Sequence, residues 1–499
     1  MLFNSYPFLL AFFPAVLLIF FLLGRRSPAL ASGSLALASL VFYGYWSIWA
    51  LPLLIVSICA NYWFGIWVTP TAGVEQRRLR ARLILAVALN LAVLGYFKYA
   101  NFFIADLNAA LRLTSSAQIR ALNVVLPIGI SFFTFTQIAF LVDCFEGKVS
   151  ERRFTHYALF VSYFPHLISG PVLHHSQMMP QFRSTRPYAP LMSNMLAGML
   201  GLTIGLAKKV LLADEFSQYA SPVFDAASAG HEVGRLAAWS GALAYTLQIY
   251  FDFSGYSDMA VGLSRMFGIQ LPLNFNAPYK ADSIIEFWRR WHMTLSQFLR
   301  DYLYVPLGGN RHGAARRYAN LMTTMLLGGL WHGASWTFVA WGGLHGAYLL
   351  INHMWRSIVA QLPRPGRLLG LLGTAAGTVL TFMVVVIAWV PFRAPTFAGA
   401  QAMLNAMFAS DGLGWLQSFA ATFREIEVPP TSFQYLGGFL AVGFAIVWLL
   451  PTTQVIVPHI AAVKGRRAWF YIGALLFGVG LLAAINASNN SSEFIYFNF

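Results

Sequence analysis

The sequence predicts an all-α polytopic integral membrane protein with about eleven transmembrane helices and one or two re-entrant or interfacial helices. Three observations predict this class. Of 499 residues, 58% are hydrophobic and only 10% are charged, against about 25% charged in soluble domains. Apolar runs recur from Pro7 to Phe494, and the connections between them alternate between basic and nearly neutral. Soluble enzymes and soluble DNA-binding proteins are therefore excluded.

The net charge of +15 fits the same class. In a soluble protein this charge would suggest a nucleic-acid partner, whereas a membrane protein carries such an excess in its cytoplasmic loops. We therefore expect no nucleic-acid partner. The two cysteines, Cys59 and Cys144, lie within or beside apolar segments, which excludes a disulfide framework and a cysteine-rich metal site.

The N-terminal segment, 1–145, contains the first predicted spans. The run at 7–24 has no positive residue before it and is followed by Arg25 and Arg26, the reverse of a cleavable signal peptide. The positive-inside rule places its N-terminus outside. Further runs long enough to cross about 30 Å of hydrocarbon lie at 30–46, 48–68, 83–104 and 122–142. The first, third and fifth connections are basic, as an external N-terminus requires.

The C-terminal spans, within 351–485, obey the same rule. Basic residues precede predicted spans at 371–390 and 469–485, with an external loop at 395–430 and a returning span at 436–450 between them. Both ends of the chain, including a tail at 486–499, are therefore expected outside. No separate soluble domain and no internal repeat is found, so residues 1–499 are predicted to form one transmembrane domain.

The central segment, 146–350, is expected to hold the functional core. Its runs at 157–172 and 192–212 are short, interrupted or amphipathic, which is typical of re-entrant or interfacial helices. Ionisable residues are costly inside a membrane and indicate function there. Asp252 and Asp258 flank a Ser-Gly pair, a break that suits irregular backbone lining a cavity. A polar packing joint between helices explains each aspartate equally well.

The segment 286–302 has the period of a helix. Glu286 and Arg290 lie four residues apart and are expected to pair, as are His292 and Ser296. The string Trp-Arg-Arg-Trp-His at 288–292 is typical of an interfacial or cavity-lining helix, with a solvated amphipathic face as the alternative.

A basic, glycine-rich turn follows at 307–317. It contains Asn310 and Arg311, with Arg316 and Arg317 close behind. This composition suits a turn that binds phosphate, and equally a positive-inside loop.

His332 is the strongest candidate for a functional residue. It follows Trp331 in an apolar, glycine-lined stretch, where an imidazole needs either a hydrogen-bond partner in the core or a chemical task. A neutral imidazole in a dry cavity can take a proton from an alcohol that attacks an acyl carbonyl. No Gly-x-Ser-x-Gly sequence is present, so direct general-base catalysis is favoured over a serine acyl-enzyme. His292 is a candidate for orienting a substrate or stabilising charge.

His174 and His175 receive no metal-binding role. Adjacent side chains are expected to diverge, and no carboxylate or cysteine nearby in the sequence completes a ligand set. We therefore predict no metal site.

Several motifs together resemble the membrane-bound O-acyltransferase family, and most closely its bacterial branch of alginate O-acetyltransferase-like proteins. They occur in order over nearly the whole chain: LPIGIS (126–131), FPHLISGP (164–171), SGYSDMA (254–260), FWRRWHMTLS (287–296), RDYLYVPLGG (300–309) and LWHGA (330–334). The aromatic tail, SSEFIYFNF (491–499), resembles the C-terminal motif of that branch.

The resemblance implies a funnel or tunnel between a cytoplasmic donor entrance and an external outlet. It implies His332 as the essential catalytic histidine, His292 as its partner, and Tyr496 as a carrier of the acyl group. The donor would be acetyl-CoA or another acyl thioester, with no bound cofactor. We assign donor or substrate binding to six residues: Arg289, Arg290, Ser296, Asn310, Arg311 and Trp331. As an alternative for the tail, its aromatic residues suit an interfacial anchor.

The resemblance also implies a setting and partners. The protein would lie in the bacterial inner membrane beside lipid, with both termini periplasmic. It would act with an external SGNH-type acetyltransferase or another acetyl-acceptor protein and with polysaccharide biosynthesis machinery, alginate-like exopolysaccharide being the first choice of polymer. The alternatives are a transporter of an acyl donor or lipid-linked sugar, and an O-acyltransferase that modifies lipids with long chains.

Overall fold

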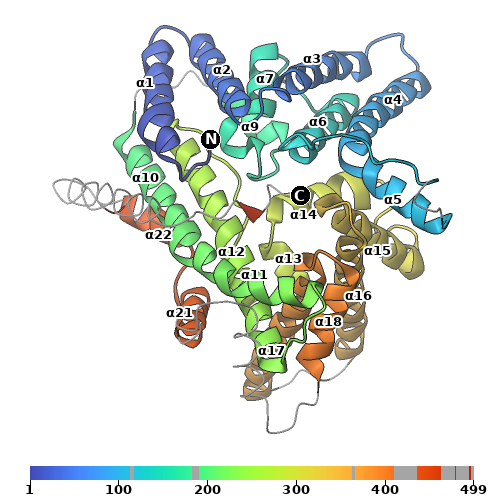
Figure 1. Cartoon of the computed structure of the whole chain (residues 1–499). Helices are drawn as coiled ribbons and strands as arrows, with labels where there is room; N and C mark the ends of the chain where they lie inside the picture. The colour runs from blue at the N-terminus through green and yellow to red at the C-terminus, as the bar shows by residue number, and fades with distance from the viewer. Residues whose placement is uncertain are drawn as a thin grey trace. The chain divides into compact units, whose positions relative to one another are not determined.

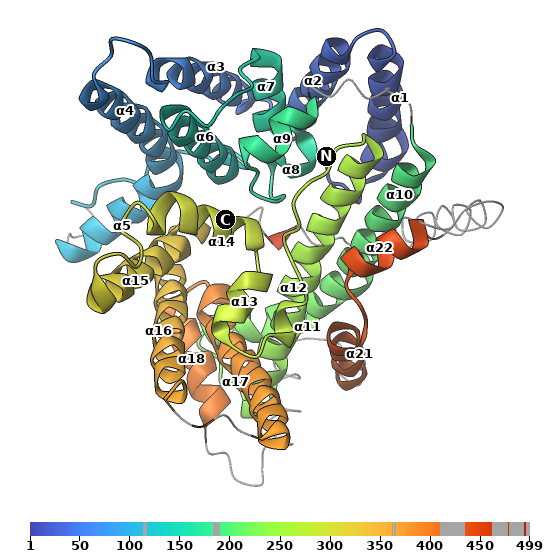
Figure 2. The same cartoon turned by 180° about the vertical axis from the view of Figure 1, so that it is seen from behind.

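The computed structural model describes residues 1–112, 117–182, 190–361, 363, 366–409, 435–461, 478 and 494–495. Regular secondary structure is helical throughout this part of the chain, and no β-strand occurs in it (Figures 1 and 2). The all-α prediction is confirmed. Two compact units form: unit 1 is Met1–Ile204, Tyr256–Leu273 and Val457–Ala487, and unit 2 is Gly205–Gly255, Asn274–Ile456 and Ser488–Phe499.

Unit 1 is built mainly from the N-terminal helices. Helix α1 packs on α2, both α3 and α4 pack on α6, and α7 packs on α2 (Figure 1). Aromatic rings pack between these helices. The ring centroids of Phe42 in α2 and Phe164 in α8, for example, are 5.5 Å apart. The elements are η1 (Pro7–Phe12), α1 (Phe13–Gly24), α2 (Pro28–Trp46), α3 (Leu51–Val68), α4 (Gln76–Leu94), η2 (Gly95–Tyr99), α5 (Ala100–Ala110), α6 (Ile130–Phe145), α7 (Phe154–Ser162), α8 (Phe164–Leu167), α9 (His175–Phe182) and most of α10 (Met192–Ala207).

Unit 2 carries the candidate motifs. Helices α15 and α16 run beside each other, α17 packs on α16, and α11 packs on α18 (Figure 2). The elements are η3 (Lys208–Ala213), α11 (Asp214–Ser228), most of α12 (Arg235–Met266), η4 (Pro278–Lys280), α13 (Ile284–Arg290), α14 (Met293–Leu299), η5 (Arg300–Tyr304), α15 (Gly313–His332), α16 (Trp336–Val359), α17 (Arg367–Arg393), α18 (Phe397–Phe408), α21 (Leu436–Leu449) and part of α22 (Thr453–Ala461).

Helix α12 continues through the Ser-Gly pair at 254–255, so the predicted break is wrong. Gly255 is a packing residue: a Cβ atom there would lie 2.8 Å from the main-chain oxygen of Gly205. Gly262 is equally close, 2.6 Å, to the main-chain oxygen of Gly198. Small residues let helix backbones approach each other in this way, so these glycines serve helix contacts within their own units.

Six helices in the described part of the chain are long and apolar enough to cross a membrane. They are Pro7–Gly24, Pro28–Trp46, Leu51–Val68, Gln76–Ala110, Met192–Ser228 and Arg367–Arg393. A seventh is formed if Leu436–Leu449 and Thr453–His459, bent by 66°, count as one span. The multi-pass prediction is confirmed, and the total of about eleven spans stays a prediction. The expected span at 469–485 lies, apart from one residue, outside the described residues.

Three predicted segments differ from the structure. The run at 122–142 becomes helical only at Ile130, because Pro127 and the left-handed Gly129 (φ +73°) precede it. The run at 192–212 is part of the continuous helix Met192–Ser228 rather than a short segment. The expected external loop begins with helix α18, whose N-terminus is capped by the Thr396 hydroxyl accepting from the Gly399 N–H at 3.0 Å.

Candidate active site

The backbone turns sharply at His292, between two short helices. The sequence predicted one helix over 286–302, but α13 ends at Arg290 and α14 begins at Met293. His292 has φ +43°, in the left-handed region that non-glycine residues rarely occupy. The extended segment before α13 holds this turn on both sides. The Asn276 N–H donates to the Arg290 carbonyl at 2.9 Å, and the Met293 N–H donates to the Asn274 carbonyl at 2.9 Å.

The Asn274 side chain fixes the orientation of the His292 imidazole. Its Oδ1 accepts from the Thr294 main-chain N–H at 3.3 Å and lies 3.0 Å from His292 Nδ1. Because a main-chain N–H can only donate, Oδ1 is an acceptor, and His292 Nδ1 must carry the proton. Nε2 is then the basic nitrogen of a neutral ring. His292 is fully buried, and burial lowers its pKa to about 3.

His332 is the last residue of α15 and lies in the same unit as His292. The two ring centroids are 6.4 Å apart. Rings of Trp331, Trp341 and Phe392 surround His332, with centroids between 5.0 and 5.3 Å away. His332 is only 3% exposed. The predicted pair of histidines therefore shares one buried aromatic site.

Glycines bring α15 and α16 close enough to form this site. A Cβ on Gly329 would lie 2.2 Å from the Phe338 main-chain oxygen, and one on Gly342 would lie 2.3 Å from that of Met325. After His332, a Cβ on Gly333 would lie 2.1 Å from the Phe338 ring. Close packing thus requires glycine at three positions of these motifs, Gly329, Gly333 and Gly342.

A further buried histidine, His345, to which the sequence assigned no role, joins the aromatic residues around His332 through Trp341. Trp288 donates from Nε1 to His345 Nδ1 at 3.3 Å, and the ring of Trp341 lies 4.8 Å from that of His345 and 5.8 Å from that of Trp389. His345, Trp341 and Trp389 are buried. The only sequence signal for His345 was its position in the stretch Trp-Gly-Gly-Leu-His-Gly at 341–346.

A buried ion pair lies beside the chain's C-terminal tail. Lys209 Nζ is 2.9 Å from Asp252 Oδ1 and 2.8 Å from Asp214 Oδ1. The Ile495 main-chain N–H donates to Asp252 Oδ2 at 2.9 Å. Asp252 is therefore a polar joint between helices, one of the two interpretations of this residue. Lys209 was missed because it stands at the end of an apolar run.

Phe494 of the tail and His292 both pack against the ring of Phe253. Phe494 is 3% exposed, its ring centroid is 6.4 Å from that of Phe253, and Phe253 packs edge-on against His292 at 4.7 Å. The predicted acyl carrier, Tyr496, lies outside the described residues. Its neighbours 494 and 495 are held in the unit that contains both histidines.

The predicted donor-binding residues do not all converge. Trp331 is buried, with its ring 6.3 Å from that of His292. Arg290 pairs with Glu286 at 2.8 Å, as predicted, and this hydrogen bond lowers the Glu286 pKa. The Ser296 hydroxyl contacts the Trp291 carbonyl at 3.4 Å, and its main-chain N–H donates to the His292 carbonyl at 3.0 Å. The His292 imidazole contacts Asn274 instead.

The remaining predicted donor contacts are exposed. Arg289 lies 3.5 Å from Glu286 with a side chain 70% exposed. Asn310 and Arg311 are exposed residues in the turn between η5 and α15. In the described part of the chain, no contact joins these three residues to either histidine. They are exposed residues rather than part of the buried site.

Comparison with known proteins identifies the family. A sequence profile of the membrane-bound O-acyltransferase family matches residues 85–387. The chain belongs to this family. The protein is therefore a membrane O-acyltransferase, which excludes the transporter alternative.

Two of three curated relatives cover most of the acyltransferase, and the third covers less than half of it. A peptidoglycan O-acetyltransferase of Helicobacter pylori is 40% identical over 444 residues, 83% of this chain and 81% of the relative. A probable alginate O-acetylase AlgI of Azotobacter vinelandii is 43% identical over 412 residues, 82% of this chain and 78% of the relative. A teichoic acid D-alanyltransferase of Streptococcus thermophilus is 28% identical over 236 residues, 46% of this chain and 57% of the relative.

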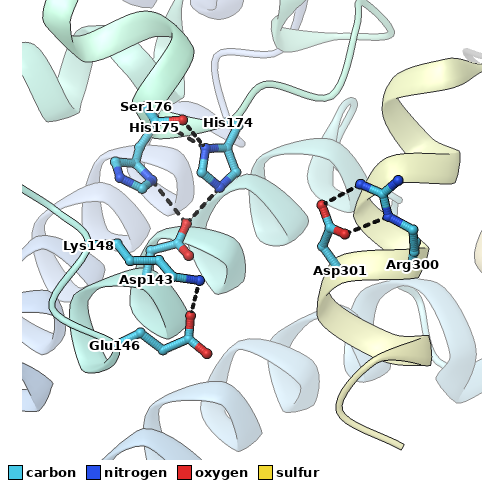
Figure 3. Close-up of polar contacts among 8 residues, drawn as sticks. All are labelled: Asp143, Glu146, Lys148, His174, His175, Ser176, Arg300 and Asp301. Atoms are coloured by element: carbon cyan, nitrogen blue, oxygen red, sulfur yellow. Dashed lines mark hydrogen bonds and ion pairs between the residues drawn. The ribbon is translucent and has the colours of Figure 1, made fainter. Parts of the chain in front are cut away.

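A second cluster of polar residues lies in unit 1. Asp143 Oδ2 is 2.9 Å from His174 Nε2 and 3.0 Å from His175 Nδ1 (Figure 3). The expectation that these side chains diverge is wrong, and a carboxylate distant in the sequence lies against both of them. The two residues stand at the start of α9, where their rings lie 4.6 Å apart, and Asp143 comes from the last turns of α6.

Proposed function

We propose that the protein transfers an acetyl group from a cytoplasmic thioester, acetyl-CoA, to a hydroxyl acceptor that leads to O-acetylation of an extracellular polysaccharide. The observation that carries the proposal is the pair of buried histidines, His292 and His332, 6.4 Å apart between ring centroids. A dry aromatic site suits acyl transfer, because water that reached the thioester would hydrolyse it.

In this proposal His332 is the general base. It removes the proton from the acceptor hydroxyl as the oxygen attacks the thioester carbonyl. The new C–O bond forms, the C–S bond breaks, and the proton passes from His332 to the departing thiolate of coenzyme A. Proton transfer by a positioned histidine contributes about 10²–10⁴-fold to the rate.

His292 has a complementary role in the proposal. Its neutral ring, held through Nδ1–H by Asn274, orients the acceptor hydroxyl with Nε2. A neutral ring is suited to accept a hydrogen bond from a hydroxyl, whereas a protonated ring could only donate. Trp331 lies against both imidazoles and forms part of the wall for the acyl group.

The first acceptor in the proposal is the hydroxyl of Tyr496. The tail is supported one residue away, where the Ile495 N–H donates to Asp252, and Phe494 is buried. An acetylated Tyr496 would then pass its acetyl group to an external SGNH-type acetyltransferase or another acceptor protein. Such a relay would use a tail on the periplasmic side, where the positive-inside pattern of the sequence puts it.

The exposed basic residues suit the donor entrance. The side chains of Arg289, Asn310 and Arg311 are exposed to solvent. We assign these cationic and amide groups to the entrance for the donor. Guanidinium groups bind phosphate in a bidentate manner, and coenzyme A carries several phosphates. The thioester arm would reach inward from these residues to the histidines, with Arg290 and Ser296 along its path.

Our first choice of polymer is an alginate-like exopolysaccharide. In this proposal the protein lies in the bacterial inner membrane and acts beside polysaccharide biosynthesis machinery. The similarity to probable alginate O-acetylases supports this choice. Peptidoglycan is the second candidate, because a relative of comparable identity is a peptidoglycan O-acetyltransferase.

The test is acetyl transfer by purified protein in proteoliposomes supplied with acetyl-labelled acetyl-CoA. His332→Ala should lower the release of free coenzyme A at least about 100-fold. His231→Ala, which removes an exposed histidine in a connecting loop, is the matched control. A His332→Ala protein that releases coenzyme A at the rate of the control would overturn the proposed base.

A further inference from the structure

The cluster of Asp143, His174 and His175 has the composition of a metal site. One ligand atom from each of the three residues can be chosen so that all lie within 4.8 Å of one another. Imidazole nitrogens and a carboxylate oxygen are a ligand set that Zn²⁺ takes in proteins. We propose that these three residues bind one divalent transition-metal ion, with Zn²⁺ as the best match. The site belongs to unit 1, whereas both candidate catalytic histidines belong to unit 2.

The distances are close to those that a metal requires. With Zn–N and Zn–O bonds of about 2.0–2.2 Å, two ligand atoms in a tetrahedral site are about 3.4 Å apart. Asp143 Oδ2 lies 2.9 Å from His174 Nε2 and 3.0 Å from His175 Nδ1. Each separation therefore needs to grow by only about 0.5 Å, which small side-chain rotations supply.

Ser176 offers His174 a hydrogen-bond partner in either tautomer. Its main-chain N–H can donate to an unprotonated Nδ1 at 3.3 Å. Ligation through Nε2 instead requires the proton on Nδ1, and the Ser176 hydroxyl, 2.6 Å from Nδ1, can then accept that hydrogen bond (Figure 3). A ligating histidine commonly gives its other N–H to such a second partner. Because His174 stays neutral in both tautomers, binding at this nitrogen needs no net release of a proton.

The partial burial of the three ligands favours an ion with four ligands, one of which comes from solvent. Asp143 and His175 are buried, while the side chain of His174 is 28% exposed. Three protein ligands and an accessible side leave the fourth tetrahedral position to a water molecule. The ion would join the end of α6 to the beginning of α9, which are 30 residues or more apart in the sequence, and would stabilise unit 1.

The competing arrangement contains no metal. Asp143 would accept one hydrogen bond from each imidazole, with His174 Nδ1 accepting from the Ser176 main-chain N–H at 3.3 Å. This arrangement satisfies the buried carboxylate without any ion. A measurement of Zn²⁺ binding distinguishes the metal site from this metal-free arrangement directly.

The experiment uses the full-length protein in detergent, carrying a purification tag without histidine and first treated with a chelator. Zn²⁺ is titrated against a competing dye, and Co²⁺ is used in place of Zn²⁺ for absorption spectroscopy. We expect saturable binding of one ion per chain, a tetrahedral Co²⁺ spectrum, and a higher thermal midpoint with Zn²⁺. Asp143→Asn and His175→Gln should abolish all three effects, whereas His231→Gln should change none.

Ser176→Ala provides a mild second variant, since Ser176 is exposed and the change leaves all three ligands in place. We expect its Zn²⁺ affinity to fall about 10- to 100-fold, the effect typical of losing a hydrogen-bond partner of a ligating histidine. The proposal is overturned if the wild-type protein shows no saturable binding, or if Asp143→Asn binds Zn²⁺ as tightly as His231→Gln. Acetyl transfer is not the readout, so failure here is distinguishable from failure of the proposed function.

Discussion

The main-chain N–H of Ile495 donates a hydrogen bond to the carboxylate of Asp252, with 2.9 Å between nitrogen and oxygen. Asp252 also contacts Lys209, at 2.9 Å, and both side chains are at most 5% exposed. The end of the chain is thus attached to a buried ion pair in the unit that contains His292 and His332. The proposed acyl carrier, Tyr496, is the next residue in the chain after this attachment point.

Removing either charge of the buried pair formed by Asp252 and Lys209 should destabilise the fold, and the two residues should behave as a coupled pair. Asp252→Asn keeps an oxygen for the Ile495 N–H but removes the charge that Lys209 faces, so we expect about 1.5–3 kcal/mol of destabilisation. Lys209→Met should have a similar cost. The double variant should lose less than the sum of the two, as coupled pairs do. Free energies of unfolding in detergent micelles would check this, and additive losses would contradict it.

Asn274 should act as a positioning residue for His292. Asn274→Leu removes the acceptor of the Nδ1–H, so the imidazole can adopt the other tautomer and turn. We expect kcat to fall about 10- to 100-fold with a smaller change in KM for acetyl-CoA. Thr294→Val is the matched control, because it removes another donor to the same Asn274 oxygen without touching the ring. Equal losses in the two variants would contradict a role through the tautomer.

The contact between α15 and α16 should tolerate no side chain at Gly329. Gly329→Ala places a Cβ 2.2 Å from the Phe338 main-chain oxygen, so the helices must separate, at a cost of about 1–3 kcal/mol or more. Gly343→Ala is the control on the same pair of helices, since its Cβ would meet Leu326 Cδ2 at an ordinary 3.5 Å. We expect a lower thermal midpoint and lower activity for the first variant only. Similar midpoints for both would contradict the packing argument.

Stability should depend on pH through His292. Burial lowers the pKa of His292 to about 3, while an unfolded histidine has a pKa of about 6.5. Below pH 6.5 the unfolded chain therefore binds a proton that the folded protein excludes, and the stabilisation is lost as pH falls. From pH 7 to pH 5 the loss assigned to this residue is about 2 kcal/mol.

His292→Gln cannot titrate and should lack that loss. The difference in unfolding free energy between the wild type and this variant should narrow as the pH falls from 7 to 5. His231→Gln is the control, and its difference from the wild type should stay constant over the same range. A wild-type advantage over His292→Gln that does not change with pH would show that His292 is not held neutral.

Composition was sufficient to predict the membrane class, because a chain with 10% charged residues cannot cover its surface with polar groups. His332 was predicted because an imidazole in an apolar, glycine-rich stretch is conspicuous, and the family resemblance paired it with His292. The backbone conformation of His292 was not predicted, since its left-handed turn depends on hydrogen bonds with Asn274 and Asn276, which precede α13. Local helical period alone therefore predicted one continuous helix and a wrong partner, Ser296.

The glycines were misread for a related reason. The Ser-Gly pair at 254–255 looked like a break, yet Gly255 sits in a continuous helix because a neighbouring helix approaches there. The cluster in unit 1 was missed because Asp143 lies about 30 residues before His174 in the sequence. Only the packing of α6 and α9 brings that carboxylate to the two imidazoles.

The most direct test of the central claim is mass spectrometry of the C-terminal peptide after the purified protein has been incubated with acetyl-CoA. We predict an acetyl group on Tyr496 in the wild type, and none on this peptide in Tyr496→Phe or His332→Ala, while His231→Ala retains it. An equal acetyl adduct in His332→Ala, or an undiminished adduct in Tyr496→Phe, would contradict the account.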